Sequence, residues 1–320
     1  MGKLISDKYA AWKQECEDRF LQLKKNEEEL NRIFIDIYGL QDELTPDVSD
    51  KDVTVHRVFD SKDDVPESMN GSNYVRTMRD EIVSLISYAV GCMFGRYSLD
   101  VDGLAYAGGE WDDSKYSTFA ADKDNIIPIS DDEYFEDDIV GRFVKFVEVV
   151  YGNDTLDENL KFIADALGGK GQPKDVIRNY FLNDFYSDHC KIYQKRPIYW
   201  LFDSGKQNGF KALIYMHRWN ADTIGNVRVE YLHRIQRVYE KEITRMQEII
   251  DNSHDNKEIS NATKRKEKLQ KQIKETKDYD AKIAHLALSR IDIDLDDGVK
   301  VNYEKVQTAD GKKMQILAKI

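Results

Sequence analysis

The stretch from His189 to Trp219 decides the fold, and it reads HCKIYQKRPIYWLFDSGKQNGFKALIYMHRW. Two runs within it, Ile198 to Phe202 and Phe210 to Met216, are rich in aromatic and β-branched residues, which favour strands. They bracket DSGKQNG, whose glycines and polar side chains are typical of a loop. The stretch therefore predicts a strand, a seven-residue loop and a second strand.

The same stretch carries an unusual charge. It holds six basic residues, seven aromatic residues and one acid, Asp203, and so has a net charge of +5 in a chain whose net charge is -12. A binding partner responds to the field within about 8 Å at physiological salt, so the local excess outweighs the total. Clustered cations neutralise phosphates, and the stretch therefore predicts a nucleic-acid-binding surface.

Helical periodicity dominates the rest of the chain. Apolar residues recur at i, i+3, i+4 and i+7 from Trp12 to Ile37, and Gly39 supplies a stop. Residues 95–130 lack this period and predict loops and short strands. Further helices are expected at 74–94, 131–150, 157–167 and 173–186, the last with Pro173 at its first position.

A long antiparallel helical hairpin is expected from residues 222–251 and 259–290, two helical patterns separated by NSHDN. The tail, residues 291–307, alternates about Asp296, Asp297 and Gly298, which predicts a short β-hairpin. The fold class expected from these patterns is α+β and predominantly α-helical, with short strands in the basic stretch from His189 to Trp219.

Four parts are expected along the chain. Residues 1–170 form a helical and mixed region with Gly/Tyr-rich loops, and residues 171–222 form a basic DNA-binding region with a β-hairpin. The long helical hairpin occupies residues 223–290, and the C-terminal β-hairpin and tail occupy residues 291–320.

The motifs of common active sites are absent from the sequence. There is no GxGxxG, GxxxxGK[ST], GxSxG, HExxH or CxxC. The five prolines are isolated, which excludes the NPPY-type loop by which amino-methyltransferases hold a flipped adenine. We predict no catalytic residue, no metal site and no bound cofactor. Three distant cysteines and the lack of an 18-residue apolar run predict a cytoplasmic protein without a membrane span.

The candidate DNA-binding residues follow from residue type and setting. Lys206, Gln207 and Asn208 in the loop are types that pair with guanine and adenine edges, although polar hairpin tips are common in any protein. A basic stripe on the helix after residue 222 is either a solvated face or a phosphate contact. The remaining candidates for phosphate contact are Arg96, Lys195, Arg196, Lys211 and Arg218, and the stripe contributes Arg234, Arg237 and Lys241.

Five long stretches carry a resemblance to a known family. Residues 26–46 (NEEELNRIFIDIYGLQDELTP), 84–112, 127–143 (IPISDDEYFEDDIVGRF), 195–219 and 291–307 (IDIDLDDGVKVNYEKVQ) are similar to the C-terminal portion of the PglX family. These are the site-specific adenine-N6 DNA methyltransferases of type 1 BREX phage-defence systems. In that family the S-adenosylmethionine site and the NPPY loop lie N-terminal to this region.

The resemblance implies a DNA-binding, target-recognition part that is inactive without the missing N-terminal methyltransferase domain. Its implied partners are double-stranded DNA, that domain and other BREX proteins. An interaction module that docks other defence proteins through its helical hairpin is the alternative.

Overall fold

A computed structural model describes residues 3–320, which divide into two compact units. Residues 3–86 and 147–173 form the first unit, and Ser87–Phe146 and Lys174–Ile320 form the second. The chain passes from the first unit to the second within α2 (Met78–Met93) and returns within α3 (Ile139–Tyr151). Each unit has its own secondary structure and is described by itself.

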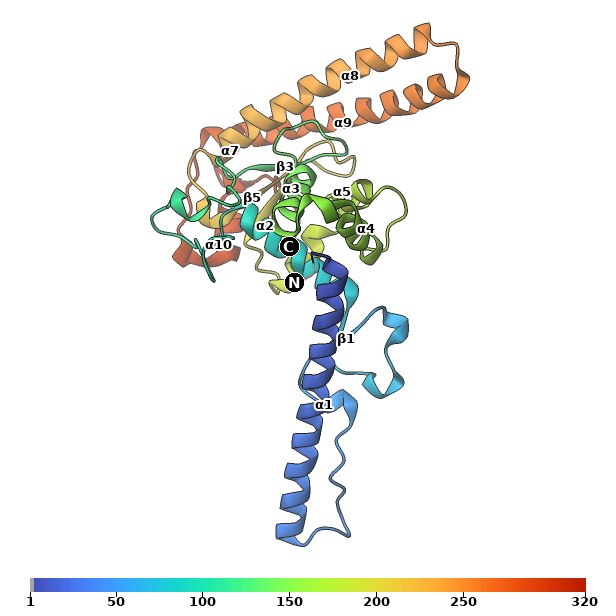
Figure 1. The fold of residues 1–320 in the computed structure, drawn as a ribbon. Helices are drawn as coiled ribbons and strands as arrows, with labels where there is room; N and C mark the ends of the chain where they lie inside the picture. The colour runs from blue at the N-terminus through green and yellow to red at the C-terminus, as the bar shows by residue number, and fades with distance from the viewer. Residues whose placement is uncertain (1–2) are drawn as a thin grey trace. The chain divides into compact units, whose positions relative to one another are not determined.

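The first unit is built on one long helix, α1 (Ile5–Tyr38), which confirms the helical pattern read from the sequence (Figure 1). The helix ends at Gly39, which adopts φ 65° and donates its N–H to the carbonyl of Asp36. The other elements of this unit are η1 (Asp50–Asp52), β1 (Arg57–Phe59), η2 (Lys62–Asp64), η3 (Glu67–Met69), β2 (Val75–Thr77), η5 (Asn153–Thr155) and α4 (Leu156–Ala166).

A small core holds the segment after α1 against the middle of this helix. Phe20 packs with Val53, Phe59 and Met69, and β1 pairs in parallel with β2. At the start of the helix the Ile5 N–H donates to the Asn159 side chain on α4 at 2.8 Å. These contacts secure the first two thirds of α1.

A three-stranded antiparallel sheet lies at the centre of the second unit. Its order is β3 (Ile127–Ile129), β5 (Lys211–Tyr215) and β4 (Tyr199–Asp203), and Leu201 pairs with Leu213. The strand, loop and strand predicted from the sequence are therefore confirmed. The C-terminal segment also reaches the free edge of β4, where the Ala318 N–H donates to the Leu201 carbonyl at 2.8 Å.

The predicted helical hairpin is also confirmed. Helices α8 (His233–Asn252) and α9 (Asn256–Leu288) run antiparallel and side by side (Figure 1). Leu269, Ile283 and Leu286 of α9 are fully buried. Between α2 and α8 the chain also forms the helical segments η4 (Asp113–Lys115), α5 (Pro173–Asn183), α6 (Phe185–Ile192), η6 (Met216–Arg218), α7 (Thr223–Asn226) and the π-helix η7 (Val227–Leu232).

Two helix boundaries differ from the prediction. The helix expected from residue 131 begins at Ile139, because the Asp138 carboxylate accepts the Val140 and Gly141 N–H groups and caps the helix there. The helix expected at 173–186 is two helices, α5 and α6, which meet at Asp184. Pro173 opens α5 as expected.

The β-hairpin predicted about Asp296, Asp297 and Gly298 is wrong. The segment forms η8 (Leu295–Asp297) and α10 (Gly298–Lys305), because Asn302, Tyr303 and Val306 share one buried helical face. A small hairpin lies further along, where β6 (Thr308–Ala309) pairs with β7 (Lys312–Lys313). Asp310 and Gly311 between them have φ of 50° and 70°, the left-handed pair of a tight hairpin turn.

The fold is thus α+β and predominantly α-helical, as predicted. The four-part division of the chain stays a prediction. Among residues 3–320, no helix combines the length and the apolar character that a membrane crossing needs.

Candidate nucleic-acid interface

Two adjoining hollows of about 580 and 520 Å³ open on the second unit. They share Asp203, Lys211, Ala318 and Lys319 and so form one continuous depression. Its lysines come from four separate parts of the chain, and Asp203 is the acidic side chain among its lining residues. We call this depression the lysine groove and define it by Lys191, Lys195, Lys206, Lys211, Lys282 and Lys319.

The chain reversal after α6 places Lys191 and Lys195 at one end of the groove. Gln194 and Lys195 both adopt positive φ, 49° and 59°, which is uncommon for residues with a side chain. The Lys195 N–H donates to the Cys190 carbonyl at 2.8 Å, and this bond closes the reversal. Lys191 and Lys195 are exposed, and so is Arg196, which follows directly but does not line either hollow.

The loop between β4 and β5 places Lys206 at the other end, and Glu275 of α9 holds this loop. The Glu275 carboxylate accepts the Ser204 hydroxyl and the Gln207 N–H at 2.8 Å and the Gly209 N–H at 3.0 Å. The side chains of Lys206 and Gln207 remain exposed. Of the predicted base-reading residues, these two therefore point into solvent from a fixed backbone.

Asn208 lies lower in the same loop. It is half-buried, its φ is 51°, and its side-chain amide lies 3.5 Å from the Asn183 side chain. Its carbonyl accepts a hydrogen bond from Gln272 at 3.3 Å. These contacts join the loop to α5 and α9.

Lys211 forms the floor of the groove. Its side chain is 10% exposed, its ammonium donates to the Leu182 carbonyl at 2.8 Å, and it lies 3.8 Å from the Asp203 carboxylate on the paired strand. Burial raises the pKa of Asp203 above its ordinary value, against the opposing effect of Lys211. The positive charge of Lys211 is therefore partly balanced by Asp203 within the protein.

Arg96 and Arg218 also have internal partners. Arg96 donates to the Tyr215 hydroxyl at 3.1 Å. Arg218 donates to the Asp122 carbonyl at 2.7 Å, and its guanidinium lies 4.1 Å from the centre of the Trp111 ring. Both predictions of DNA contact stay untested, but the geometry favours a role in fixing the loops around residues 95–123.

The basic stripe on α8 lies outside the lysine groove. Arg234, Arg237 and Lys241 are exposed and line neither hollow, and the Arg234 guanidinium lies 5.2 Å from the Phe135 ring. The structure thus brings Lys195, Lys206, Asn208 and Lys211 together around the groove, while the three residues of the stripe form a separate set.

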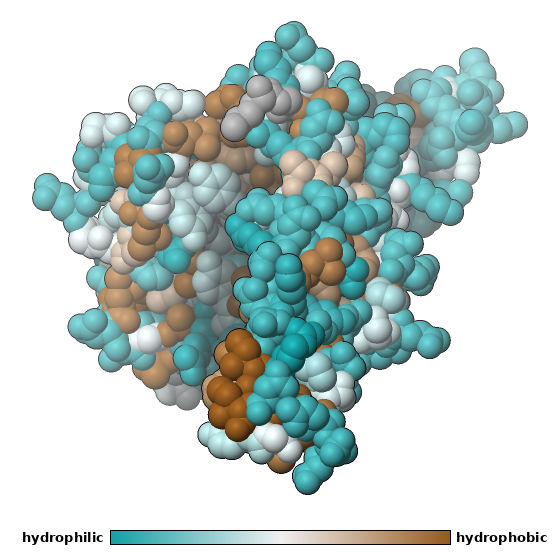
Figure 2. Space-filling view, turned by 60° about the horizontal axis from the view of Figure 1, so that its bottom comes forward, coloured by the Kyte–Doolittle hydropathy of each residue, from teal (hydrophilic) through white to brown (hydrophobic). Residues whose placement is uncertain are grey.

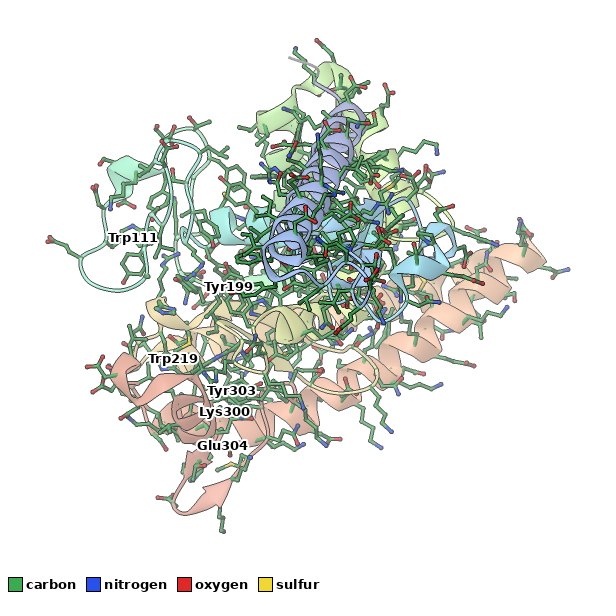
Figure 3. The ribbon with its side chains drawn as sticks, turned by 90° about the horizontal axis from the view of Figure 1, so that it is seen from below. Trp111, Tyr199, Trp219, Lys300, Tyr303 and Glu304 are labelled. Atoms are coloured by element: carbon green, nitrogen blue, oxygen red, sulfur yellow. The ribbon has the colours of Figure 1, made fainter. Side chains whose placement is uncertain are left out.

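The aromatic residues of the central strands are scaffold. Tyr199, Trp200 and Tyr215 are at most 1% exposed. Trp200 contacts the rings of Trp219 and Tyr303, whose side chains lie near each other in Figure 3. These rings lie in the core of the unit and are not available to stack on bases.

Lys191, Lys282 and Lys319 were not predicted as site residues from the sequence, although Lys191 belongs to the basic stretch from His189 to Trp219. Lys282 is one of many exposed lysines on α9, and nothing in the helical pattern distinguishes it. Lys319 reaches the groove because the segment before it joins the edge of β4, where Phe202 bridges Leu317. The tail QILAKI, residues 315–320, has three consecutive apolar residues and lacks the alternation of a half-buried strand, so there was no clear signal for this contact in the sequence.

The groove is suited to phosphodiesters. Exposed ammonium groups act as point charges toward phosphate oxygens. Lys211 partly neutralises the Asp203 carboxylate, so the electrostatic field in the groove remains positive. Hollows of about 580 and 520 Å³ are too small to enclose a duplex, so a DNA backbone would lie along the groove rather than inside it. Among residues 3–320, no set of three or more His, Cys, Asp or Glu side chains is placed to hold a metal ion.

No family model matches the chain, but two curated proteins do. The adenine-specific methyltransferase PglX of Lacticaseibacillus casei (strain Zhang) is 47% identical over 303 residues, covering 93% of this chain and 24% of the relative. The adenine-specific methyltransferase BrxX of Escherichia coli O9:H4 (strain HS) is 37% identical over 325 residues, covering 95% of this chain and 27% of the relative. The chain spans about a quarter of the length of these relatives. Over nearly its whole length the chain therefore matches one part of these proteins, and it belongs to the PglX/BrxX family of adenine-specific methyltransferases.

Proposed function

We propose that this chain is the DNA-binding and target-recognition part of a site-specific adenine-N6 DNA methyltransferase that serves BREX phage defence. The observation that carries the proposal is the lysine groove, in which lysines from four segments converge around one carboxylate. The names of the two relatives support an adenine as the target of the complete enzyme. Methyl transfer and S-adenosylmethionine binding belong to the part of the enzyme outside these 320 residues.

Recognition in this proposal has two components. The exposed lysines of the groove other than Lys206 position the duplex through its phosphates, a contact that depends on charge and carries no sequence information. Lys206 and Gln207, held by Glu275, reach base edges in the major groove from a fixed loop. The rest of the enzyme then acts on the adenine so presented, which has to leave the base stack for the reaction.

The phosphate component is tested by the salt dependence of duplex binding. The double variant Lys195→Ala/Arg196→Ala should lower the slope of log K against log salt concentration by about 0.9 for each lost phosphate contact. The matched control is Lys8→Ala/Lys25→Ala, which removes two exposed lysines from α1. Equal slopes for the two double variants would remove Lys195 and Arg196 from the interface.

The base-reading component needs the complete enzyme. Gln207→Ala should change the set of methylated sites while leaving non-specific affinity for duplex DNA unchanged, because the side chain is exposed and its backbone contact to Glu275 persists. The readout is sequencing of methylated adenines. An unchanged target site would show that Gln207 does not read a base.

An interaction module remains the second candidate. The hairpin of α8 and α9 extends as a long arm in Figure 1, which is suited to docking another protein. Failure of the chain to bind duplex DNA even at low salt would favour that function over DNA recognition.

A further inference from the structure

The last turns of α1 carry an apolar face without a partner among residues 3–320. Leu30, Ile33, Phe34, Ile37 and Tyr38 are 54, 46, 50, 68 and 70% exposed. They follow one another at i, i+3, i+4, i+7 and i+8, so they lie on one side of the helix. Figure 2, which brings the lower end of the Figure 1 view forward, shows a brown patch at the end of this helix. We call these five residues the α1 face.

The segment after α1 covers a different side of the helix. Its Pro46 carbonyl accepts a hydrogen bond from the Asn31 side chain at 3.1 Å, and Ile35, one turn further along the same side, is 8% exposed. The core around Phe20 covers the earlier turns. Single exposed apolar side chains are ordinary, but five on one helical face are typical of an interaction surface.

The charge around the α1 face indicates the kind of partner. Residues 24–47 contain seven acidic and three basic residues, a net charge of -4. Two copies of this chain that met through the face would bring two such segments together, and like charges oppose that pairing. A partner with basic residues beside an apolar surface complements the face in both respects.

The length of the relatives indicates where such a partner lies. The chain corresponds to 24 and 27% of the two relatives, so about three quarters of the family's polypeptide lies outside it. A surface on the same polypeptide has a high effective concentration and needs no separate encounter. We propose that the α1 face docks an apolar, basic-flanked surface of the methyltransferase polypeptide outside these 320 residues. The proposal does not rest on DNA binding.

Hydrogen exchange tests the proposal in the complete methyltransferase. The backbone amides of residues 30–38 should exchange at least about tenfold more slowly in the complete enzyme than in the 320-residue chain, because docking suppresses local opening of the helix end. The charged variant Phe34→Glu/Ile37→Glu should abolish this difference. Both side chains are at least half exposed in the chain, so the substitutions leave its core intact.

Leu21→Glu is the matched control. Leu21 is 52% exposed on the same helix, nine residues before Leu30, and thus about 180° from the α1 face. It should leave the slow exchange of residues 30–38 unchanged. An equal loss of protection in both variants would show a general effect of charge on the helix and overturn the proposal.

Two other outcomes would also overturn it. Exchange of residues 30–38 that is equally fast in the complete enzyme would show that the face stays uncovered there. Sedimentation of the 320-residue chain as a dimer that Phe34→Glu/Ile37→Glu dissociates would identify a second copy as the occupant. Duplex binding by the chain should be the same with and without these substitutions, so failure here is distinguishable from failure of the proposed DNA function.

Discussion

Glu275 should be the residue on which the loop at 204–209 depends most. Its carboxylate accepts two hydrogen bonds at one oxygen, from Ser204 and Gly209, and one at the other, from Gln207. Gly209 is buried, and a Cβ there would lie 2.8 Å from the Gln272 carbonyl oxygen, so the loop backbone lies directly against α9. The loop has little space in which to find other partners.

The cost of Glu275→Ala can be worked out bond by bond. A hydrogen bond to a charged acceptor contributes about 1.5–3 kcal/mol, and a buried N–H left without a partner costs about 1–3 kcal/mol. Gln207 is exposed and Ser204 is half-buried, so water replaces much of what they lose. The buried Gly209 N–H carries most of the effect, and we expect a loss of about 2–4 kcal/mol from the free energy of unfolding.

Glu275→Gln should cost less. Its carbonyl oxygen keeps the bonds from Ser204 and Gly209, while its amide group faces the Gln207 N–H and loses that bond. One bond at an exposed residue corresponds to about 1 kcal/mol. The expected order of destabilisation is therefore Ala above Gln, and both above Glu267→Ala, an exposed glutamate on the same helix that should change stability by less than about 0.5 kcal/mol.

Urea unfolding gives the stability, and hydrogen exchange at Gln207 and Gly209 locates the change. Faster exchange of these two amides in Glu275→Ala, with smaller effects in Glu275→Gln, is the expected result. If Glu275→Ala matched Glu267→Ala in both measurements, the carboxylate would not be what holds the loop.

Two further predictions concern the core of the second unit. Burial lowers the pKa of His189 to about 3, and the neutral ring accepts the Tyr199 N–H at 3.1 Å. The stability that the neutral ring contributes is therefore complete above the unfolded pKa of about 6.5, and it falls by about 1.4 kcal/mol for each pH unit below that value. The variant His189→Gln, followed by urea unfolding from pH 4 to 7, should lack this dependence of the unfolding free energy on pH. Gly91→Ala should destabilise by about 1–3 kcal/mol because a Cβ there collides with the Tyr97 ring, whereas Gly225→Ala, with nothing within 4 Å, should be neutral or stabilising by up to about 1 kcal/mol in thermal unfolding. Equal effects of the two glycine substitutions would contradict the predicted collision.

Elements with long, regular patterns could be predicted from the sequence. Helix α1 and the hairpin of α8 and α9 repeat the helical period over many residues, and strands β4 and β5 are runs of aromatic and β-branched residues separated by a polar, glycine-containing loop. The tail could not be predicted in the same way. Its sequence IDIDLDDGVKVNYEKVQ fits the alternation of a strand, and it also fits a helix with Asn302, Tyr303 and Val306 on one buried face. Burial of these three residues against the rest of the unit decided for the helix.

The candidate site was only partly accessible to sequence reasoning. Residue type identifies a lysine but does not show whether its ammonium faces water or a carbonyl. Lys211 and Arg218 belong to the basic stretch from His189 to Trp219, yet they bond to the carbonyls of Leu182 and Asp122. Tertiary packing makes that choice, and the same packing brings in Lys319 from a distant segment.

These internal contacts limit how steeply DNA binding can depend on salt. The Lys211 ammonium is bound within the floor of the groove, and Lys206 is assigned to base edges. The residues proposed for phosphate contact are then Lys191, Lys195, Lys282 and Lys319, together with Arg196, which follows Lys195. Five phosphate contacts correspond to a slope of log K against log salt concentration of about -4.5 on duplex DNA. A shallower slope is compatible with the groove as the whole interface, because some of these lysines need not reach a phosphate. A steeper slope requires cations elsewhere, and the stripe on α8 is the next candidate. Neutralising Arg234, Arg237 and Lys241 together would then reduce the slope by about 2.7 units, whereas an unchanged slope would exclude the stripe from the interface.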